Sequence, residues 1–328
     1  MTSGARRPLA VVAFGGNALL GPRDLGTVDE QKRRAEEAAG WLAHFVRRDH
    51  DLVIVHGNGP QVGQVLIQME EAATKVPPGT LDVAVAQTQG SMGFLLETAL
   101  RNRFAVEAEE ADGGNRDREV AIVLSLVVVD GDDPGFEDPS KPIGPFFSRW
   151  RAEQLQKDQG WQMVEDSGRG WRKVVASPRP LEVLGVEPIR HLLASGAVVI
   201  AGGGGGIPVV RDENGDLAGV EAVIDKDFTS ALLARELGAE LFIILTSVSQ
   251  VSRDYGTDDE TPLPRITLSE ARRLLDDGQF PPGSMGPKVR AAMDFVAATG
   301  EKVVITDIET LPAALAGDGG TVIVRDDD

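Results

Sequence analysis

The sequence feature that most constrains the fold is a run of five glycines directly after a short hydrophobic segment. Residues 197–201 read Ala-Val-Val-Ile-Ala, and glycines occupy 202–206 before Ile207 and Pro208. The β-branched residues predict a buried strand, whereas consecutive glycines have no side chains to pack and are costly to order. We therefore expect backbone that approaches a ligand at the carboxyl end of a strand in an α/β sheet. A flexible turn between two strands is the alternative.

Two earlier segments show the same organisation. Residues 9–14 form an apolar run that ends in glycines at 15–16, and residues 52–55 form a second that ends in the stretch 56–60, His-Gly-Asn-Gly-Pro. If the three strands lie side by side, the N–H groups of their loops converge on one edge of the sheet. Helix N-termini behind the first two loops would add positive potential, which suits a phosphate or carboxylate. Asn17 and Asn58 would each cap a helix or donate to that anion.

The hydrophobic pattern predicts one α/β domain over residues 1–328, a three-layer αβα sandwich with a mostly parallel central sheet. Helical periodicity covers 29–48, 61–71 and 81–101, the last broken by Gly90 and Gly93, and a single strand is expected over 119–129. The second half repeats the alternation, with strands at 197–201, 241–245, 302–306 and 321–324, helices at 226–237, 268–277, 285–299 and 311–316, and a hairpin of 209–210 with 220–224. Ser269 is the expected cap of the 268–277 helix.

Residues 130–177 differ from the surrounding pattern. Prolines at 139, 142 and 145 exclude regular helix there, and Trp150, Trp161 and Trp171 supply bulky residues for a small separate core. We interpret this segment as an inserted, protruding subdomain. A surface loop of that length without structure is the alternative, and such loops are uncommon.

Composition excludes several classes of function. The net charge of −18 argues against binding DNA or RNA through a basic face. The chain has no cysteine, which excludes disulfides, thiolate nucleophiles and zinc–sulfur sites, and no two of its four histidines have helical metal-site spacing. The first apolar run is too short for a signal-peptide core, and no run approaches the ~20 residues of a membrane span. We therefore expect a soluble, cytoplasmic protein.

The known phosphate-binding motifs do not account for these loops. The chain has no P-loop pattern. Residues 57–63 give G-x-G-x-x-x-G, one residue longer than the dinucleotide fingerprint, and Pro60 removes an N–H that a pyrophosphate would need. A nicotinamide dehydrogenase is thus a weak alternative.

Three lysines occupy constrained positions in this acidic chain. Lys141 is framed by prolines, Lys226 lies between two aspartates at a strand-to-helix boundary, and Lys288 follows a proline at the start of a helix. Surface lysines usually occupy flexible polar faces, so these three favour cations directed at an anion. A solvated ion pair is the alternative for each.

Seven stretches in order along the chain carry distinctive patterns: 14–18 (FGGNA), 56–63 (HGNGPQVG), 139–146 (PSKPIGPF), 168–175 (GRGWRKVV), 202–210, 219–227 and 282–288 (PGSMGPK). Together they resemble the carbamate kinases of the amino-acid kinase superfamily. The resemblance implies reversible phosphoryl transfer between ATP and carbamate, giving ADP and carbamoyl phosphate. A carbamate oxygen is already an anion, so the reaction needs positioned cations rather than a general base.

The resemblance also implies roles for individual residues and partners. The catalytic set is Lys141, Lys226, Asp227 and Lys288; the phosphoryl group is held by Gly15, Gly16 and Asn17, the carbamate by Gly57 and Asn58 with Gly59 beside them, and the nucleotide by Gly203, Gly204, Thr246, Val248, Tyr255 and Met285. Mg²⁺ enters with ATP or ADP, held mainly by the phosphates and with no ligand assigned to the protein. Residues 130–177 are implied to be a lid that carries Lys141, and the assembly to be a homodimer.

One loop departs from the family pattern. Ser249, followed by Gln250, stands where carbamate kinases often carry an acidic residue, which bears on nucleotide affinity or choice more than on phosphoryl chemistry. Two other functions stay open: a paralogous kinase acting on another small carboxylate or carbamate, and a non-catalytic regulator that binds carbamoyl phosphate or nucleotide.

Overall fold

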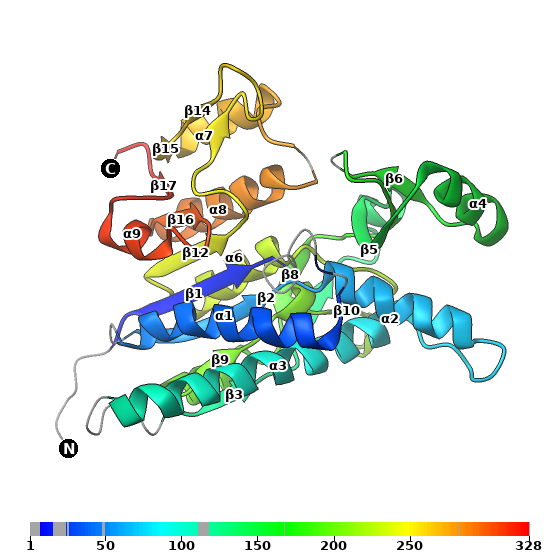
Figure 1. The fold of residues 1–328 in the computed structure, drawn as a ribbon, viewed down its shortest axis with the longest axis horizontal. Helices are drawn as coiled ribbons and strands as arrows, with labels where there is room; N and C mark the ends of the chain where they lie inside the picture. Colours follow the sequence, from blue (N-terminus) through cyan, green and yellow to red (C-terminus); the bar gives the residue numbers. More distant parts are fainter. Residues whose placement is uncertain are drawn as a thin grey trace.

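An eight-stranded sheet forms the middle layer of the protein, which we describe from a computed structural model over residues 7–15, 24, 26–47, 50–110, 118–166, 168–281 and 283–327 (Figure 1). The strand order is β15-β17-β16-β12-β1-β2-β9-β3, and every neighbouring pair except β16–β17 is parallel. The strands are β1 (Leu9–Phe14), β2 (Asp51–His56), β3 (Val120–Ile122), β9 (Val198–Ile200), β12 (Leu241–Leu245), β15 (Arg265–Thr267), β16 (Val303–Thr306) and β17 (Thr321–Val324).

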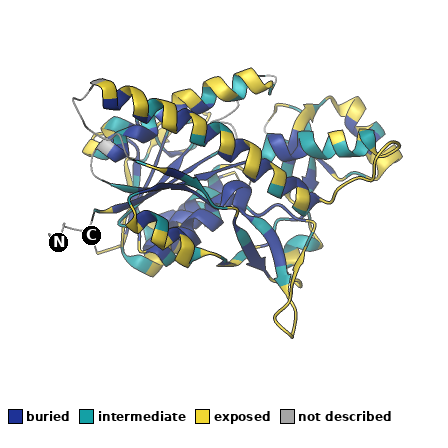
Figure 2. Ribbon diagram, turned by 90° about the horizontal axis from the view of Figure 1, so that it is seen from below, coloured by how far each residue is buried: buried dark blue, intermediate teal, exposed yellow. Residues whose placement is uncertain are grey.

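Helices cover both faces of this sheet. Successive side chains of a strand point to opposite faces; Val11 and Ala13 of β1 pack in one hydrophobic cluster, and Ala10 and Val12 pack in the other. The first cluster lies under α5 (Val186–Ala194), α6 (Lys226–Leu237) and α8 (Met285–Thr299), and the second under α1 (Val28–Arg47), α3 (Leu81–Glu110) and α9 (Leu311–Ala316). Figure 2 shows the buried strands between helices whose outer faces are exposed. The predicted three-layer sandwich is confirmed.

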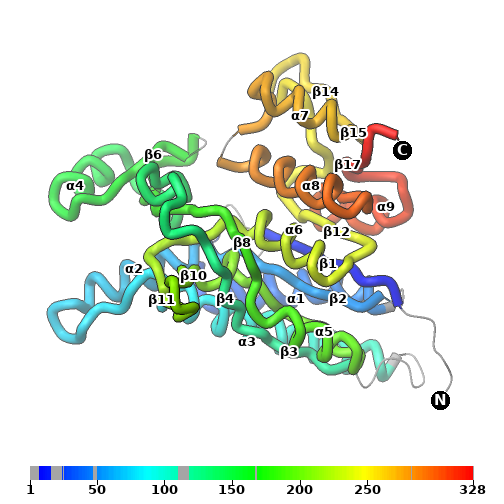
Figure 3. Tube along the Cα trace, turned by 180° about the vertical axis from the view of Figure 1, so that it is seen from behind, coloured from blue at the N-terminus to red at the C-terminus, as the bar shows by residue number. Residues whose placement is uncertain are grey.

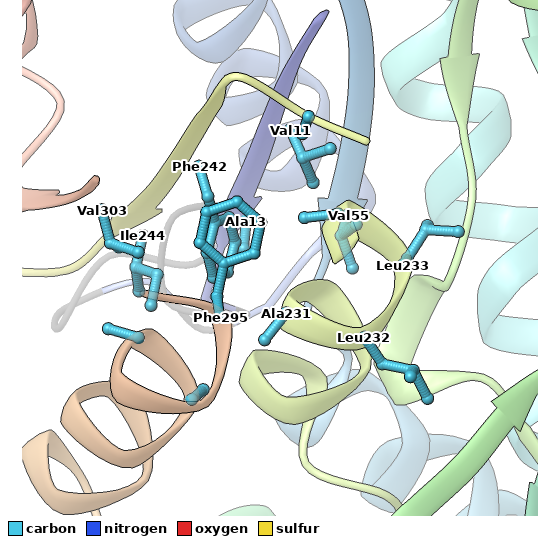
Figure 4. Packing of buried hydrophobic residues seen from close by; sticks show 14 of the residues in the cluster. Val11, Ala13, Val55, Ala231, Leu232, Leu233, Phe242, Ile244, Phe295 and Val303 are labelled. Atoms are coloured by element: carbon cyan, nitrogen blue, oxygen red, sulfur yellow. The ribbon is translucent and has the colours of Figure 1, made fainter. Parts of the chain in front are cut away.

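Aromatic packing fixes α8 against the sheet. Phe242 of β12 and Phe295 of α8 meet edge to face with ring centroids 5.3 Å apart, and both side chains are fully buried (Figure 4). Offset or edge-on contacts of this kind suit the charge distribution of aromatic rings. The contact holds the helix that carries Lys288 at a fixed height above the sheet.

The three glycine loops lie side by side, as predicted. The strands that precede them, β1, β2 and β9, are consecutive and parallel, so their carboxyl ends share one edge of the sheet. The N–H of Gly57 donates to the carbonyl of Phe14 at 2.8 Å, which places the first two loops in direct contact. Strand β12, on the other side of β1, ends at the same edge.

The single strand expected over 119–129 is wrong. The chain forms β3 at the edge of the main sheet and then β4 (Leu126–Val129), which enters a second sheet of order β11-β10-β4-β8 with β8 (Pro180–Val183), β10 (Ile207–Arg211) and β11 (Leu217–Gly219). Ser125 lies at the crossing point, fully buried, and its backbone N–H and carbonyl bond the side-chain amide of Gln89. These tertiary hydrogen bonds set the break; the apolar sequence has no glycine or proline there to signal it.

Three smaller expectations are corrected as well. α3 is one continuous helix that passes through both Gly90 and Gly93. At Gly93 the missing side chain makes room for Ile122 of β3, which would lie 3.0 Å from a Cβ there. The hairpin after β10 returns through β11, not through 220–224. Thr267 rather than Ser269 caps α7 (Leu268–Asp276), in a capping box with Glu270.

The segment 130–177 forms a three-stranded sheet and one helix that stand apart from the main sheet (Figures 1 and 3). It contains β5 (Lys141–Phe147), α4 (Arg149–Gln159), β6 (Met163–Glu165) and β7 (Trp171–Val175), in the sheet order β5-β7-β6. Ala152, Leu155 and Met163 make a separate apolar cluster, against which Trp161 and Trp171 pack. Trp150 was expected to belong to this core but does not, because it is 67% exposed.

A glycine–glycine contact joins this segment to the main domain. α2 (Gly59–Ala72) packs against β5, and a Cβ built on Gly63 would lie 2.1 Å from the Cα of Gly144. A side chain at 63 would overlap the backbone of Gly144, so this approach requires glycine at 63, and the φ of +74° at Gly144 favours glycine there as well. Among the described helices, none is long and apolar enough to cross a membrane.

The glycine run at 202–206 approaches the protein's own neighbouring loops. A Cβ would lie 2.4 Å from His56 Nε2 at Gly203, 2.2 Å from Asn58 Nδ2 at Gly204 and 2.2 Å from the Ile224 carbonyl at Gly205. All five glycines are buried. The run therefore makes room for the side chains of His56 and Asn58 and for the backbone of Ile224, which accounts for its length better than a turn does.

The substitution Gly205→Ala should therefore destabilise the fold by more than the strain of a positive φ alone, because the new Cβ also meets neighbouring atoms. Gly205 and Gly215 have nearly the same φ, +92° and +89°, but no described atom lies within 4 Å of a Cβ at Gly215. We expect Gly215→Ala to cost about 1 kcal/mol of strain and Gly205→Ala a further ~1–3 kcal/mol from overpacking. Thermal midpoints of the two variants measure the difference; equal midpoints would refute the steric argument.

Candidate active site

The site begins at the boundary between the segment 220–225 and α6. Asp225 is the N-cap of α6; its Oδ1 accepts the N–H of Asp227 at 3.0 Å, and its Oδ2 accepts Lys141 Nζ at 2.6 Å. Aspartate is among the preferred N-cap residues, since it satisfies a backbone N–H that the helix leaves free. The same side chain thus fixes the start of α6 and binds a lysine from β5, 84 residues away in sequence.

The other two predicted lysines share one carboxylate. Lys226 Nζ lies 2.5 Å from Asp227 Oδ1, and Lys288 Nζ lies 2.8 Å from Asp227 Oδ2. Asp227 and Lys226 are on the first turn of α6 and almost fully buried, whereas Lys288 comes from the first turn of α8. All three lysines that the sequence singled out therefore converge on two adjacent aspartates.

Burial and charge oppose each other in this cluster. Burial would raise the pKa of Asp227, but the ammonium groups of Lys226 and Lys288 outweigh it and hold that pKa well below its ordinary value. Burial also favours the neutral form of both lysines. For Lys226 this effect prevails, and its pKa is lowered. For Lys288 the charges of Asp227 and Asp225 outweigh burial, and its pKa is raised. The aspartates stay ionised, and Lys226 is the cation whose charge depends most on its partner.

The loop after β2 supplies a second, uncharged group of side chains. Asn58 precedes α2 but does not cap it; its Nδ2 donates instead to Thr88 Oγ1 of α3 at 2.9 Å. His56 is 1% exposed, and burial lowers its pKa to about 4, so that its ring is neutral at pH 7. Both side chains lie against the glycine run, as the contacts at Gly203 and Gly204 show.

Two hydroxyl groups hold the glycine run in place. Ser125 Oγ accepts the N–H of Gly202 at 2.8 Å, and Thr229 Oγ1 of α6 donates to the Gly205 carbonyl at 2.7 Å. The glycine run is thus tied to the helix that carries Lys226 and Asp227. Gly203 and Gly204 lie between the lysine cluster and the loop of His56 and Asn58.

The remaining predicted site residues lie at the same edge of the sheet or outside the described chain. Gly15 directly follows β1 and is half-buried, and Gly57 and Gly59 flank Asn58. Gly16 and Asn17 are outside the described residues.

On the expected nucleotide side, Thr246 directly follows β12, and its N–H donates to the Thr306 carbonyl at 2.8 Å. Val248 is half-buried in the same loop, Met285 is the first residue of α8, and Tyr255 is 60% exposed. Among the departures from the family pattern, Gln250 has a structural partner, because its Nε2 donates to the Gly320 carbonyl at 2.9 Å.

Sequence reasoning missed Asp225, the partner of Lys141. The signal available was its place one residue before Lys226 at the start of a helix, which predicts a cap but not a distant lysine. It also missed Thr88 and Ser125, whose hydroxyls are buried in hydrogen bonds to the site loops. Neither lies near a recognisable motif.

Within the described residues, no three histidine, aspartate or glutamate side chains gather as a metal site. Asp225 and Asp227 are both engaged by lysines, which compete with a cation for the same oxygens. A surface hollow lined by Arg7, Asp51 and Arg190 lies at the opposite, amino-terminal edge of the strands and is remote from these groups.

Comparison with known proteins shows the family to which the chain belongs. Residues 8–307 match the model of the amino acid kinase family. The carbamate kinase of Pyrococcus horikoshii is 42% identical over 315 residues, which cover 95% of this chain and 98% of the relative. A carbamate kinase-like protein of Escherichia coli is 42% identical over 322 residues, covering 97% and 99% of the two chains.

Solved structures show the same similarity. The carbamate kinase of Giardia lamblia bound to citric acid aligns with a TM-score of 0.91 at 38% identity, and its complex with AMP-PNP aligns with a TM-score of 0.86 at 39% identity. Each alignment covers 98% of this chain and 99% of the other. The chain therefore belongs to the amino acid kinase family, and within that family it groups with the carbamate kinases.

Proposed function

We propose that the protein catalyses reversible phosphoryl transfer between ATP and carbamate, giving ADP and carbamoyl phosphate. The observation that carries the proposal is the convergence of Lys141, Lys226 and Lys288 on two buried aspartates at the carboxyl edge of the sheet. Three ammonium groups against two carboxylates leave one net positive charge, which suits a phosphoryl group. The carbamate kinase relatives support this choice of substrates.

The reaction asks little covalent chemistry of the protein. The attacking carbamate oxygen is an anion, so catalysis consists of positioning the two substrates and neutralising charge on the transferred group. Lys226 and Lys288 would bind the nucleotide phosphates, and Asp227 would hold both ammonium groups in place. Gly57 and Asn58 would bind the carbamate, and Gly15 with Gly16 and Asn17 the phosphoryl group.

The nucleotide would lie on the side of β12. Gly203 and Gly204 would face its phosphates, while Thr246, Val248, Tyr255 and Met285 would border the adenine and ribose. Mg²⁺ would arrive on the nucleotide and be held mainly by its phosphates, and it would supply further positive charge to the transferred group. A site that uses ATP in this way fits a cytoplasmic enzyme.

The segment 130–177 would act as a lid. It carries Lys141 on β5, and it packs on the main domain through the close contact of Gly63 with Gly144. Closure over the substrates would exclude water, which otherwise hydrolyses ATP.

A second candidate function is a kinase for another small carboxylate. The relative in Escherichia coli is named only as carbamate kinase-like, and its similarity to this chain is the reason to test this candidate. The same site would bind any small planar carboxylate that fits the loop after β2. Supplying several acyl phosphates in one assay separates the two candidates.

The direct test supplies carbamoyl phosphate and MgADP and measures ATP. We expect ATP formation by the wild type, and a loss of ~10²-fold or more in turnover for Lys226→Ala, because a fixed charge aimed at the transferred group is removed. Lys302→Ala, an exposed lysine before β16, is the matched control and should keep full turnover. A folded wild type that makes ATP only from another acyl phosphate would establish the second candidate, and one that makes none would rule out both kinases.

The pH profile tests the lysine–aspartate cluster. Asp227 raises the pKa of Lys226 against the effect of burial, so Asp227→Asn should lower that pKa further. Lys226 acts as a cation; activity is therefore lost as pH rises through its pKa, and the alkaline limb of kcat/KM should move to lower pH in the variant. Asp276→Asn, on the exposed face of α7, is the control. An unmoved limb would contradict the coupling of Lys226 to Asp227.

We further propose a homodimer formed through α3. This helix exposes Val83 and Phe94 on one face, and β3 beside it is the edge strand of the main sheet. Leu124, two residues after β3, is 56% exposed. An apolar helix face beside an open edge fits a second copy of the same surface.

The variant Phe94→Asp should therefore shift the protein from dimer to monomer. A buried unpaired carboxylate at the centre of an isologous interface occurs twice, once on each protomer. Light scattering after size exclusion gives the mass of each species. Val28→Asp, an equally exposed site on α1, should leave the dimer intact; a dimer that survives Phe94→Asp would exclude this face.

A further inference from the structure

A turn directly after β13 (Ser252–Arg253) has an unusual backbone. Asp254 has a φ of +52° and is the one residue of the described chain, other than glycine, with a positive φ. Aspartate enters this left-handed region more readily than most residues, but such backbone persists only where its surroundings hold it, and it is concentrated at functional sites. The next residue, Tyr255, is the only tyrosine of the chain and is 60% exposed. The turn therefore presents an aromatic ring to solvent.

Gln279, which follows α7, holds this backbone in place. Its Oε1 accepts the N–H of Asp254 at 2.7 Å, and its Nε2 donates to Asp254 Oδ1 at 3.1 Å. One amide thus binds both the backbone and the side chain of a residue 25 positions away in sequence. This reciprocal pair fixes the position of Asp254 and also its orientation.

The chain after Tyr255 is held as well. The carbonyl of Asp254 accepts the N–H of Thr257 at 3.1 Å and its Oγ1 at 2.7 Å. The N–H of Gly256 donates to Glu260 Oε2 at 3.0 Å. The backbone is therefore fixed on both sides of Tyr255 while the ring stays exposed. A ligand that covers this ring finds it already in place, so that binding costs less ordering.

Gln279 also lies close to the helix that carries Lys288. Two residues after Gln279, the carbonyl of Pro281 accepts the N–H of Gly286 at 2.9 Å. Gly286 is the second residue of α8, directly after Met285. Gln279 thus links the turn of Tyr255 to the end of α8 that carries Met285 and Lys288.

The loop that leads to this turn lies at the carboxyl edge of the main sheet. The N–H of Val251 donates to Thr321 Oγ1 at 2.8 Å, and Thr321 pairs with Ile305 near the carboxyl end of β16. β16 is parallel to β12, so both strands end at the edge where the lysine cluster lies. The turn therefore follows a loop that is anchored at the same edge as the lysines.

We propose that Asp254 and Gln279 are positioning residues that set Tyr255 against the base of the nucleotide. The ring stacks on one face of the base, and the pair fixes the place of the ring relative to the start of α8, where Lys288 binds the phosphates. Stacking of this kind uses the π face that every base has. This inference rests on the proposed function and deepens it by assigning what holds the base side of the nucleotide site.

The first test removes the two hydrogen bonds. Gln279→Met keeps the length of the side chain but cannot bind Asp254. We expect the Kd of ADP to rise about tenfold, the equivalent of ~1.4 kcal/mol, because Tyr255 must then be ordered on binding. The Kd of inorganic pyrophosphate, which has no base, should keep its wild-type value. Titration calorimetry with Mg²⁺ present measures both constants.

The second test concerns the side chain of Asp254. Asp254→Ala loses the oxygen that accepts Gln279 Nε2 and should raise the Kd of ADP as Gln279→Met does. Asp254→Asn keeps an oxygen for that bond and tolerates the positive φ, so it should restore tight binding of ADP. Asp258→Ala, exposed in the same loop, is the matched control and should keep the wild-type Kd. An asparagine variant as weak as the alanine variant would contradict the role of this bond.

A double-mutant cycle tests whether the effect passes through the ring. Tyr255→Ala alone should raise the Kd of ADP at least as much as Gln279→Met does. Adding Gln279→Met to Tyr255→Ala should then raise it no further, because the group that is positioned is gone. Additive effects of the two substitutions would overturn the inference.

The remaining outcomes separate this inference from the function on which it rests. A wild type that binds ADP but forms no ATP from carbamoyl phosphate overturns the proposed function alone, and one that binds no ADP overturns both. A Gln279→Met variant with the wild-type Kd of ADP overturns the inference even if its thermal midpoint falls, since the pair is then structural only. Equal increases in the Kd of ADP and of pyrophosphate overturn it as well, because the substitution then acts on the phosphate side of the site.

Discussion

The rest of the structure depends on the burial of Asp227 between two lysines. Moving an ion out of water costs several kcal/mol, and only close opposite charges with good hydrogen-bond geometry offset that cost. Asp227 meets this condition by drawing Lys288 from α8 to Lys226 on α6, while Asp225 draws Lys141 from the inserted segment. Segments far apart in sequence are therefore held to one point, and the excess of positive charge at that point is what the proposed phosphoryl transfer requires.

Close backbone packing brings that charge cluster to the loop after β2. The glycines at 203–205 touch His56, Asn58 and the Ile224 carbonyl, and Ile224 directly precedes the charged triplet at 225–227. A side chain at any of these positions would push the lysine cluster away from the loop proposed to bind carbamate. The glycines set the distance between the two halves of the site, and the lysines set its charge.

The sequence predicted the elements well because strand and helix periods are local properties. It also placed three loops on one edge correctly, since parallel strands bring their carboxyl ends together. It failed where the deciding contact is distant: Ser125 splits the strand at 119–129 through hydrogen bonds to Gln89, and Asp225 meets a lysine 84 residues away. It failed again at Gly90 and Gly93, because a helix packed along its length tolerates glycines that would break an isolated one.

The inserted segment 130–177 brings two cationic side chains to the main domain. Lys141 and Arg172 both belong to it, yet Lys141 binds Asp225 of the main domain and Arg172 faces the N-terminus of α2. The glycine contact between α2 and β5 brings both side chains to the edge of the sheet at once. Under the proposed function, a substrate that engages Lys141 gains from it only when the segment lies in this position. Under that proposal, substrate binding would favour this position of the segment, because a ligand shifts an equilibrium by its difference in affinity for the two states.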